Sequence, residues 1–340
     1  MTEEISKNML RDRAKKLPEI TDEMWLQVNK EYRDLVRNYL RSQPHSPKTK
    51  KQYTSNLRQF GWYIYSELRN KPIYKIKKTD IINFLSYLKE DCGQASSTIN
   101  NSKASISSLC NYIENVVMDD YDEDEVNPYK NFRNFTRGLP KVAKSKVYEK
   151  VKVTKEEYLL MMSNLENKKN YLGMAWLATA FNTGARRNEI IQFKTEIINY
   201  DFPEDQTYIM THKVRLKGEG EQGKVEAYMM NAEALKYIKL YLENKEHEHE
   251  YIFTKKFKGE IKVVNESWAN YFCTNVLSPM LGRRINPHLF KASAITYLLE
   301  QGVPLDLVSK HVAHHENVAT TISHYDLRDY AEAKNNIFGN

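Results

Sequence analysis

Histidine, lysine and tyrosine side chains gather near the end of the 340-residue sequence, and their types suit chemistry on a phosphate. His288 and Lys291 have helical spacing, so one helix face can carry both. His314 and His315 follow, and Tyr325 closes a late amphipathic segment. Cationic side chains neutralise the charge that develops on phosphate oxygens, while a tyrosine hydroxyl attacks phosphorus once its proton has an acceptor. This stretch therefore predicts a phosphoryl-transfer site.

A second motif, Thr-Gly-Ala-Arg-Arg-Asn-Glu, follows an apolar helix expected over residues 171–181. Gly184 ends that helix, Arg186 lies in the turn, and Glu189 begins the next helix. An arginine at a buried helix start, oriented by a glutamate one turn away, can bind a phosphate through two parallel hydrogen bonds. Its neighbour Arg187 is the better candidate for a surface ion pair.

These motifs resemble the active-site pattern of the tyrosine recombinase, or phage integrase, family. They occur in that family's order: Thr-Gly-x-Arg-x-x-Glu, His-x-x-basic, His, Thr-Thr and Tyr. The resemblance implies an enzyme that binds specific duplex DNA sites and, without a cofactor, cleaves and rejoins them through a 3'-phosphotyrosine. It assigns catalytic roles to Arg186, His288, Lys291, His314 and Tyr325, and supporting roles to Glu189 and His315.

Short strands are expected after the arginine motif, and a Gly-rich turn, GEGEQG, separates the last two of them. In the family, a lysine on this hairpin reaches into the DNA minor groove and protonates the leaving 5'-oxygen. Lys217 resembles that lysine, and Lys213 and Lys224 are close enough in sequence to compete for the role. The expected strands are 208–210, 214–216 and 225–229.

Two features depart from the family pattern. Lys291 stands where the family has its second arginine, and lysine lacks the planar fork that holds two phosphate oxygens. The spacing to Tyr325 is eleven residues from His314 or ten from His315, longer than is usual in the family. A second hypothesis follows from these departures: a DNA-binding transcriptional regulator or repressor that keeps the recombinase fold but has lost strand transfer.

The N-terminal half has apolar residues at helical spacing over 46–135, which predicts a compact bundle of about four helices. Hydroxyl and basic residues crowd two of its helix starts, where backbone N–H groups favour phosphate. These two stretches also resemble the signature segments of the family's N-terminal, SAM-like core-binding domain, which clamps one face of duplex DNA. The DNA-binding candidates are Lys48, Thr49, Lys51, Ser97, Thr98, Asn101 and Lys103.

The predicted fold is mainly α-helical with a small antiparallel β-sheet, in two principal domains. Between them lies a basic segment whose lysines, Lys144 and Lys146 among them, are expected to follow DNA phosphates. Thr154 and Glu157 form a capping box that begins the second domain. The expected segments are an N-terminal helical extension (1–45), the core-binding bundle (46–135), the linker (136–153) and the catalytic-type domain (154–340).

Composition supports a polyanionic partner. The formal net charge is +7, and lysine and arginine side chains release counterions when they meet DNA phosphates. Double-stranded DNA is therefore the expected partner, and the resemblance adds a homo-oligomer, a dimer or a tetramer, assembled on DNA.

Other classes of site are not favoured. The three cysteines, Cys92, Cys110 and Cys273, are too far apart to predict a zinc site or a disulfide framework. The His-Glu-His-Glu run at 247–250 is expected to be a polar loop, so no metal site is predicted there or at His314. No apolar run is long enough to cross a membrane, and no signal peptide is evident. A cytoplasmic location is expected.

Overall fold

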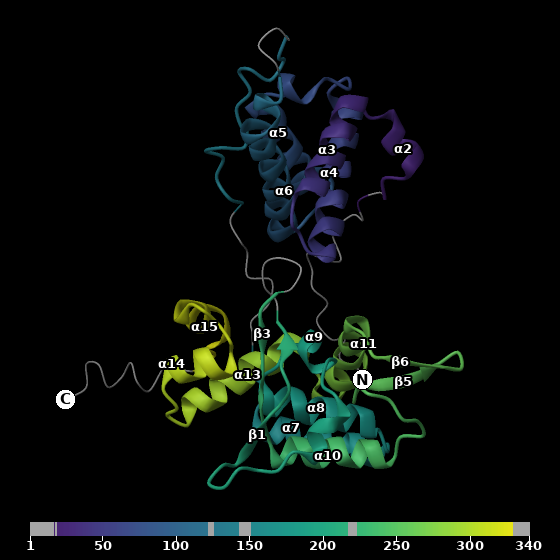
Figure 1. Cartoon of the computed structure of the whole chain (residues 1–340), viewed down its shortest axis with the longest axis vertical. Helices are drawn as coiled ribbons and strands as arrows, with labels where there is room; N and C mark the ends of the chain where they lie inside the picture. The colour runs from purple at the N-terminus through teal and green to yellow at the C-terminus, as the bar shows by residue number, and fades with distance from the viewer. Residues whose placement is uncertain (1–16, 18, 122–125, 143–150, 217–222, 329–340) are drawn as a thin grey trace, which may run out of the picture. The chain divides into compact units, whose positions relative to one another are not determined.

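A computed structural model describes residues 17, 19–121, 126–142, 151–216 and 223–328, which fall into two compact units (Figure 1). Lys144, Lys146 and Lys217 lie outside the described residues. The model confirms the predicted fold class, because helices make up most of both units and the strands are short and antiparallel. None of the described helices is both long enough and apolar enough to cross a membrane.

The N-terminal unit is a helical bundle. Ser46 caps its longest helix, accepting a hydrogen bond from the backbone of Thr49 at 3.2 Å, and Pro47 suits the first turn. Tyr32, in the expected N-terminal extension, is buried in the same core and donates to the Leu57 carbonyl at 3.0 Å. The boundary at residue 46 stays a prediction. The elements are α2 (Asp22–Gln27), α3 (Lys30–Ser42), α4 (Pro47–Glu67), η1 (Ile73–Lys75), α5 (Lys78–Ser86), η2 (Tyr87–Asp91), α6 (Ser96–Asn115) and η3 (Val117–Asp119).

The C-terminal unit is built around a buried helix, α8, against which α7, α10 and α13 pack. The predicted capping box of Thr154 and Glu157 begins α7, the first helix described in this unit. The helical elements are α7 (Lys155–Asn167), α8 (Tyr171–Thr183), α9 (Arg187–Ile190), η4 (Thr195–Asn199), α10 (Ala232–Glu243), α11 (Glu266–Tyr271), η5 (Phe272–Leu277), α12 (Ser278–Leu281), α13 (Pro287–Glu300), α14 (Leu305–Leu307), η6 (Val308–Val312) and α15 (Val318–Tyr325).

The strands of this unit form three separate antiparallel pairs. The predicted strand segments contribute two of these pairs. The strand at 208–210 pairs with the one at 229–231, and the two strands between them in sequence pair with each other. The third pair is a hairpin that sequence analysis missed. The pairs are β1 (Tyr208–Met210) with β4 (Met229–Asn231), β2 (Val214–Arg215) with β3 (Val225–Glu226), and β5 (Thr254–Phe257) with β6 (Glu260–Val263).

Gly184 ends α8 as predicted, and it also allows a close approach. Its φ of +62° is left-handed, a conformation that glycine adopts without strain. A Cβ there would lie 3.2 Å from the Cβ of Ala294, which belongs to α13. The turn that carries Arg186 is therefore packed directly against the helix that carries His288 and Lys291.

Candidate functional site

Arg186 lies at the N-cap position of α9, and a buried glutamate fixes it from two directions. Its backbone N–H donates to Oε2 of Glu189 at 2.6 Å, and its guanidinium Nη1 donates to Oε1 at 3.1 Å. The Glu189 side chain is 2% exposed, whereas that of Arg186 is 21% exposed. Glu189 thus fixes the orientation of Arg186 and leaves part of its guanidinium exposed.

The buried carboxylate has a third donor that the sequence analysis missed. The hydroxyl of Tyr228 donates to Oε2 of Glu189 at 2.5 Å, and the ring of Tyr228 is fully buried. Burial by itself raises the pKa of Glu189, but Lys291, Arg186 and the Tyr228 hydrogen bond together bring that pKa below its usual value. Glu189 is therefore a carboxylate in the folded protein. Nothing in the strand pattern around Tyr228 distinguishes it from an ordinary core residue.

His315 connects Arg186 to the C-terminal helix. Its Nε2 lies 3.2 Å from Nη2 of Arg186, and its Nδ1 lies 2.9 Å from the hydroxyl of Thr321. Because Thr321 donates its own hydrogen to Ser309, His315 donates from Nδ1 and accepts from Arg186 at Nε2. Burial, with Lys291 and Arg186 as further causes, lowers the pKa of His315 to about 4. The imidazole is therefore neutral near pH 7.

His314 points elsewhere, because its backbone φ of +52° turns the chain between the two histidines. Its ring packs edge-on against Tyr228, with centroids 4.5 Å apart. Burial and Lys291 lower the pKa of His314 to about 4, and its buried Nε2 has no hydrogen-bond partner among the described residues. His315, rather than His314, thus lies beside Arg186 and Tyr325. The catalytic role expected for His314 and the supporting role expected for His315 stay predictions.

Tyr325 ends α15 beside two imidazoles. Its hydroxyl oxygen lies 3.4 Å from Nε2 of His288, and its ring centroid lies 4.7 Å from that of His315. The backbone of Tyr325 is fixed to α13, since the Thr296 hydroxyl donates to its carbonyl at 3.0 Å. A tyrosine hydroxyl beside a proton acceptor and a partly open arginine is an arrangement suited to attack on a phosphate ester.

Lys291 is fully buried beneath this group. Its Nζ donates to the carbonyl of Gly184 at 3.2 Å, so it holds the turn that precedes Arg186. Burial lowers the pKa of Lys291 to about 7. The positive charge of Arg186 is the second cause, and the Glu189 carboxylate opposes the shift. The predicted contact of Lys291 with a phosphate stays a prediction.

Of the three hairpin lysines, Lys217 lies outside the described residues, so its predicted role stays a prediction. Lys224 forms an ion pair with Glu226, with Nζ to Oε1 at 3.3 Å. Lys213 precedes β2 at the surface.

The candidate DNA-binding residues of the N-terminal unit lie in the N-terminal parts of α4 and α6. Lys103 differs from the others, because its ammonium donates to the carbonyls of Leu139 and Pro140. It therefore holds the start of the predicted linker against α6, as Asn100 does through Val142. Lys48, Lys51, Ser97 and Asn101 are exposed, and Thr49 and Thr98 are partly buried.

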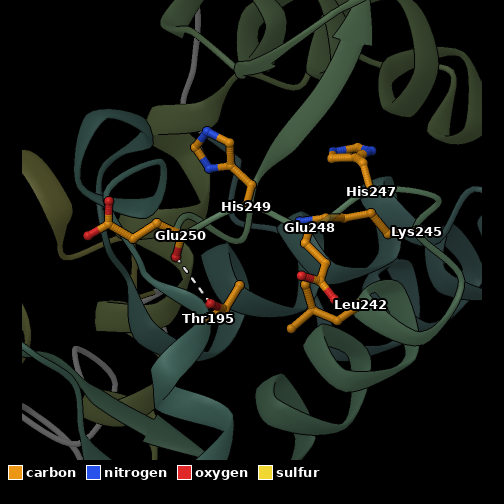
Figure 2. A pocket seen from close by; sticks show the side chains of 7 residues that line it. All are labelled: Thr195, Leu242, Lys245, His247, Glu248, His249 and Glu250. Carbon is orange, nitrogen blue, oxygen red and sulfur yellow. Dashed lines mark hydrogen bonds between the residues drawn. The ribbon is translucent and has the colours of Figure 1, made fainter.

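A pocket of about 570 Å³ lies away from this group, and Figure 2 shows its lining. His247 and His249 line it but are engaged locally: Nε2 of His247 lies 2.9 Å from the Thr254 hydroxyl, and Nδ1 of His249 accepts from the Tyr251 backbone at 3.0 Å. Within the described ranges, no three histidine, cysteine or acidic side chains group closely enough to hold a metal ion.

The Tyr228 hydroxyl should contribute measurably to stability. Tyr228→Phe keeps the ring but leaves the buried Glu189 carboxylate with one donor fewer, which should lower the free energy of unfolding by about 1–3 kcal/mol. Urea denaturation near neutral pH measures the change. Tyr237→Phe, on the half-buried side of α10, is the matched control, and equal effects of the two substitutions would show that the Tyr228–Glu189 bond contributes nothing.

Lys291 should make stability depend on pH. Its pKa is lowered to about 7 by folding, so over the range from about 7 to its ordinary value near 10.4 the unfolded chain binds a proton that the native chain has lost. The cost of burying Lys291 is thus greatest below about pH 7 and falls as pH rises. Relative to Lys291→Met, the wild type should gain about 2–3 kcal/mol in unfolding free energy between about pH 6.5 and about pH 9.5.

Urea denaturation of both proteins at the two pH values measures this gain. Lys236→Met, at an exposed position of α10, is the control and should run parallel to the wild type. A Lys291→Met curve that also runs parallel would contradict the buried ammonium.

Known proteins match the chain along both units. The Phage integrase family model matches residues 152–332, and the model "Phage integrase, N-terminal SAM-like domain" matches residues 32–137. The SPbeta prophage-derived recombinase-like protein YomM of Bacillus subtilis (strain 168) is 58% identical over 339 residues, covering 99% of this chain and 100% of that protein.

Solved structures share the fold at low sequence identity. The Tn1549 transposon integrase in complex with transposon right end DNA has a TM-score of 0.62 at 18% identity, covering 91% of this chain and 100% of that one. The XerH recombinase bound to difH substrate has a TM-score of 0.62 at 18% identity, covering 95% and 98%. From the two family models and the YomM match, the chain belongs to the phage integrase, or tyrosine recombinase, family.

Proposed function

We propose that this chain binds duplex DNA at specific sites and exchanges DNA strands through a covalent bond between Tyr325 and a 3'-phosphate. The observation that carries the proposal is the position of the Tyr325 hydroxyl, 3.4 Å from His288, next to an Arg186–His315 pair held by a buried glutamate. Relatives of the same fold are described as bound to transposon end DNA and to a difH substrate, which supports DNA as the ligand.

Each side chain then has a separate task. The Tyr325 oxygen attacks phosphorus, its proton passes to Nε2 of His288, and the bond from phosphorus to the 5'-oxygen breaks. Arg186 neutralises the non-bridging oxygens, in an orientation that its bonds to Glu189 and His315 fix in advance. The leaving 5'-oxygen takes a proton, for which the family resemblance offers Lys217.

The reaction exchanges one phosphodiester for another, so it needs no external energy source. A 5'-hydroxyl from a second strand can attack the phosphotyrosine, which reverses the step and frees Tyr325 to take back its proton. This balance agrees with the expectation that no cofactor takes part. We further propose a homodimer or tetramer on DNA and a cytoplasmic location.

We also propose that the core-binding bundle (46–135) and the catalytic-type domain (154–340) contact the same duplex, with the segment 136–153 as the basic connection between them. Residues 1–45 would extend the bundle, and Lys144 and Lys146 would follow the phosphates. Within this segment, Val142 makes two hydrogen bonds to α6: its carbonyl accepts from the side-chain amide of Asn100, and its backbone N–H donates to the amide oxygen of Asn100.

Strand cleavage can be tested by covalent trapping. A site is first selected from random duplexes by binding, and a nicked version of it is then incubated with the protein. We expect a protein–DNA adduct that survives denaturing electrophoresis, because loss of the short nicked strand prevents rejoining. Tyr325→Phe should abolish the adduct and leave affinity unchanged, since it removes only the nucleophilic oxygen.

The matched control is Tyr297→Phe, which alters a tyrosine exposed on α13 and should still form the adduct. If the wild type binds DNA tightly but forms no adduct with any nicked site, strand transfer is wrong for this chain. A recombinase-fold DNA-binding regulator would then be the correct function.

DNA binding itself should depend steeply on salt, because each phosphate contact releases a counterion. Lys48→Gln combined with Lys51→Gln should lower the slope of log affinity against log salt concentration by about 1.8. Lys89→Gln combined with Lys130→Gln removes two exposed charges elsewhere in the N-terminal unit and should leave the slope unchanged. Fluorescence anisotropy titrations at several salt concentrations measure both, and equal slopes for the two pairs would reject this DNA-contact assignment.

A further inference from the structure

The β5–β6 hairpin takes no part in the site around Tyr325, yet it projects from the body of the C-terminal unit (Figure 1). Its strands pair in register, with Lys255 opposite Lys262 and Phe257 opposite Glu260. Lys258 and Gly259 form the turn with φ values of +50° and +85°, the left-handed geometry of tight hairpin turns. Lys258 therefore lies at the tip of the hairpin, in a conformation that a lysine adopts only at some cost.

The base of the hairpin is firmly anchored. Thr254 is fully buried, and its carbonyl accepts a hydrogen bond from the Tyr241 hydroxyl at 2.5 Å. Its hydroxyl lies 2.9 Å from Nε2 of His247. On the other strand, the backbone of Val264 donates to the carbonyl of Phe253 at 2.9 Å. These hydrogen bonds fix the direction in which the hairpin leaves the unit, although its outer residues are exposed.

One face of the arm combines positive charge with an aromatic ring. Lys255, Phe257 and Lys262 share this face because strand residues alternate sides and directly opposed residues point the same way. The ammonium groups of Lys255 and Lys258 lie 6.0 and 5.8 Å from the centre of the Phe257 ring, which is 50% exposed. Glu260 lies opposite Phe257 and so belongs to the same face. We name Lys255, Phe257, Lys258, Glu260 and Lys262 the hairpin face.

The hairpin face carries a cost that an anion would relieve. Lys255 and Lys262 lie directly opposite each other, and like charges in that position destabilise a hairpin. Glu260 compensates only in part, through an ion pair with Lys262 at 2.6 Å. Lysines also protect exposed strand edges from aggregation, but that purpose does not account for a half-exposed phenylalanine between them.

We propose that the hairpin face binds the sugar–phosphate backbone of duplex DNA, outside the phosphate bound at Arg186. Lys255 and Lys258 would neutralise phosphates, and Phe257 would lie against deoxyribose. The inference rests on the proposed function, because it assumes that duplex DNA is the ligand of the C-terminal unit. Charge complementarity is its main support: the hairpin face carries three lysines and a single glutamate.

The chain offers a control one residue away. Lys256 has the same charge and lies on the same strand, but it pairs with Ile261 and points to the opposite face. Both lysines are exposed, so glutamine at either position leaves the fold unchanged. We therefore compare Lys255→Gln with Lys256→Gln by fluorescence anisotropy on the selected duplex, over a range of salt concentrations.

Lys255→Gln should weaken binding several-fold and lower the salt slope by about 0.9, the value for one phosphate contact. Phe257→Ala should weaken binding without changing the slope, and Lys256→Gln should match the wild type. Equal affinities and slopes for Lys255→Gln, Lys256→Gln and the wild type would overturn this inference, as would a loss confined to Lys256→Gln. Both outcomes leave the proposed function intact, whereas a wild type that binds no duplex would overturn the proposed function itself.

Discussion

The site depends on one buried carboxylate. Glu189 accepts hydrogen bonds from the backbone and guanidinium of Arg186 and from the hydroxyl of Tyr228. A buried charge is costly unless its oxygens are satisfied, and here both oxygens have donors. Because Glu189 closes the first turn of α9 and Tyr228 immediately precedes β4, a single carboxylate fixes the arginine relative to the strands before any phosphate arrives. Such preorganisation lowers the reorganisation needed during a reaction.

The second constraint is the left-handed backbone at His314. With φ at +52°, adjacent histidines separate: His314 packs on Tyr228, and His315 reaches Arg186 and Tyr325. Such a backbone conformation costs about 1–3 kcal/mol and persists where the surrounding packing holds it. One residue with positive φ thus allows two adjacent histidines to contact Tyr228 and Arg186 separately. The ten-residue spacing between His315 and Tyr325 is accommodated by the turn before α15, which Asn317 caps.

Local signals in the sequence were sufficient for one helix start and one helix end. The capping box at Thr154 and the stop at Gly184 depend on a few neighbouring residues, and both are found as expected. The separation of His314 from His315 depends on one backbone angle, and the Tyr228 bond depends on a partner 39 residues away. Neither has a periodic pattern to reveal it. The β5–β6 hairpin had only a weak signal, Lys-Gly before the alternating run 260–263, because two adjacent lysines interrupt the alternation in its first strand.

The exchange of the family's arginine for Lys291 changes where positive charge lies, as well as the number of hydrogen bonds it can make. Its ammonium donates to the Gly184 carbonyl and its side chain is fully buried, whereas the Arg186 side chain is partly exposed. A phosphate beside Arg186 would add negative charge close to Lys291 and raise its pKa from about 7. Lys291 would then be more fully charged with DNA bound than without it. Such a through-space field, which strengthens on binding, would stabilise the phosphate whether or not Lys291 also contacts it directly.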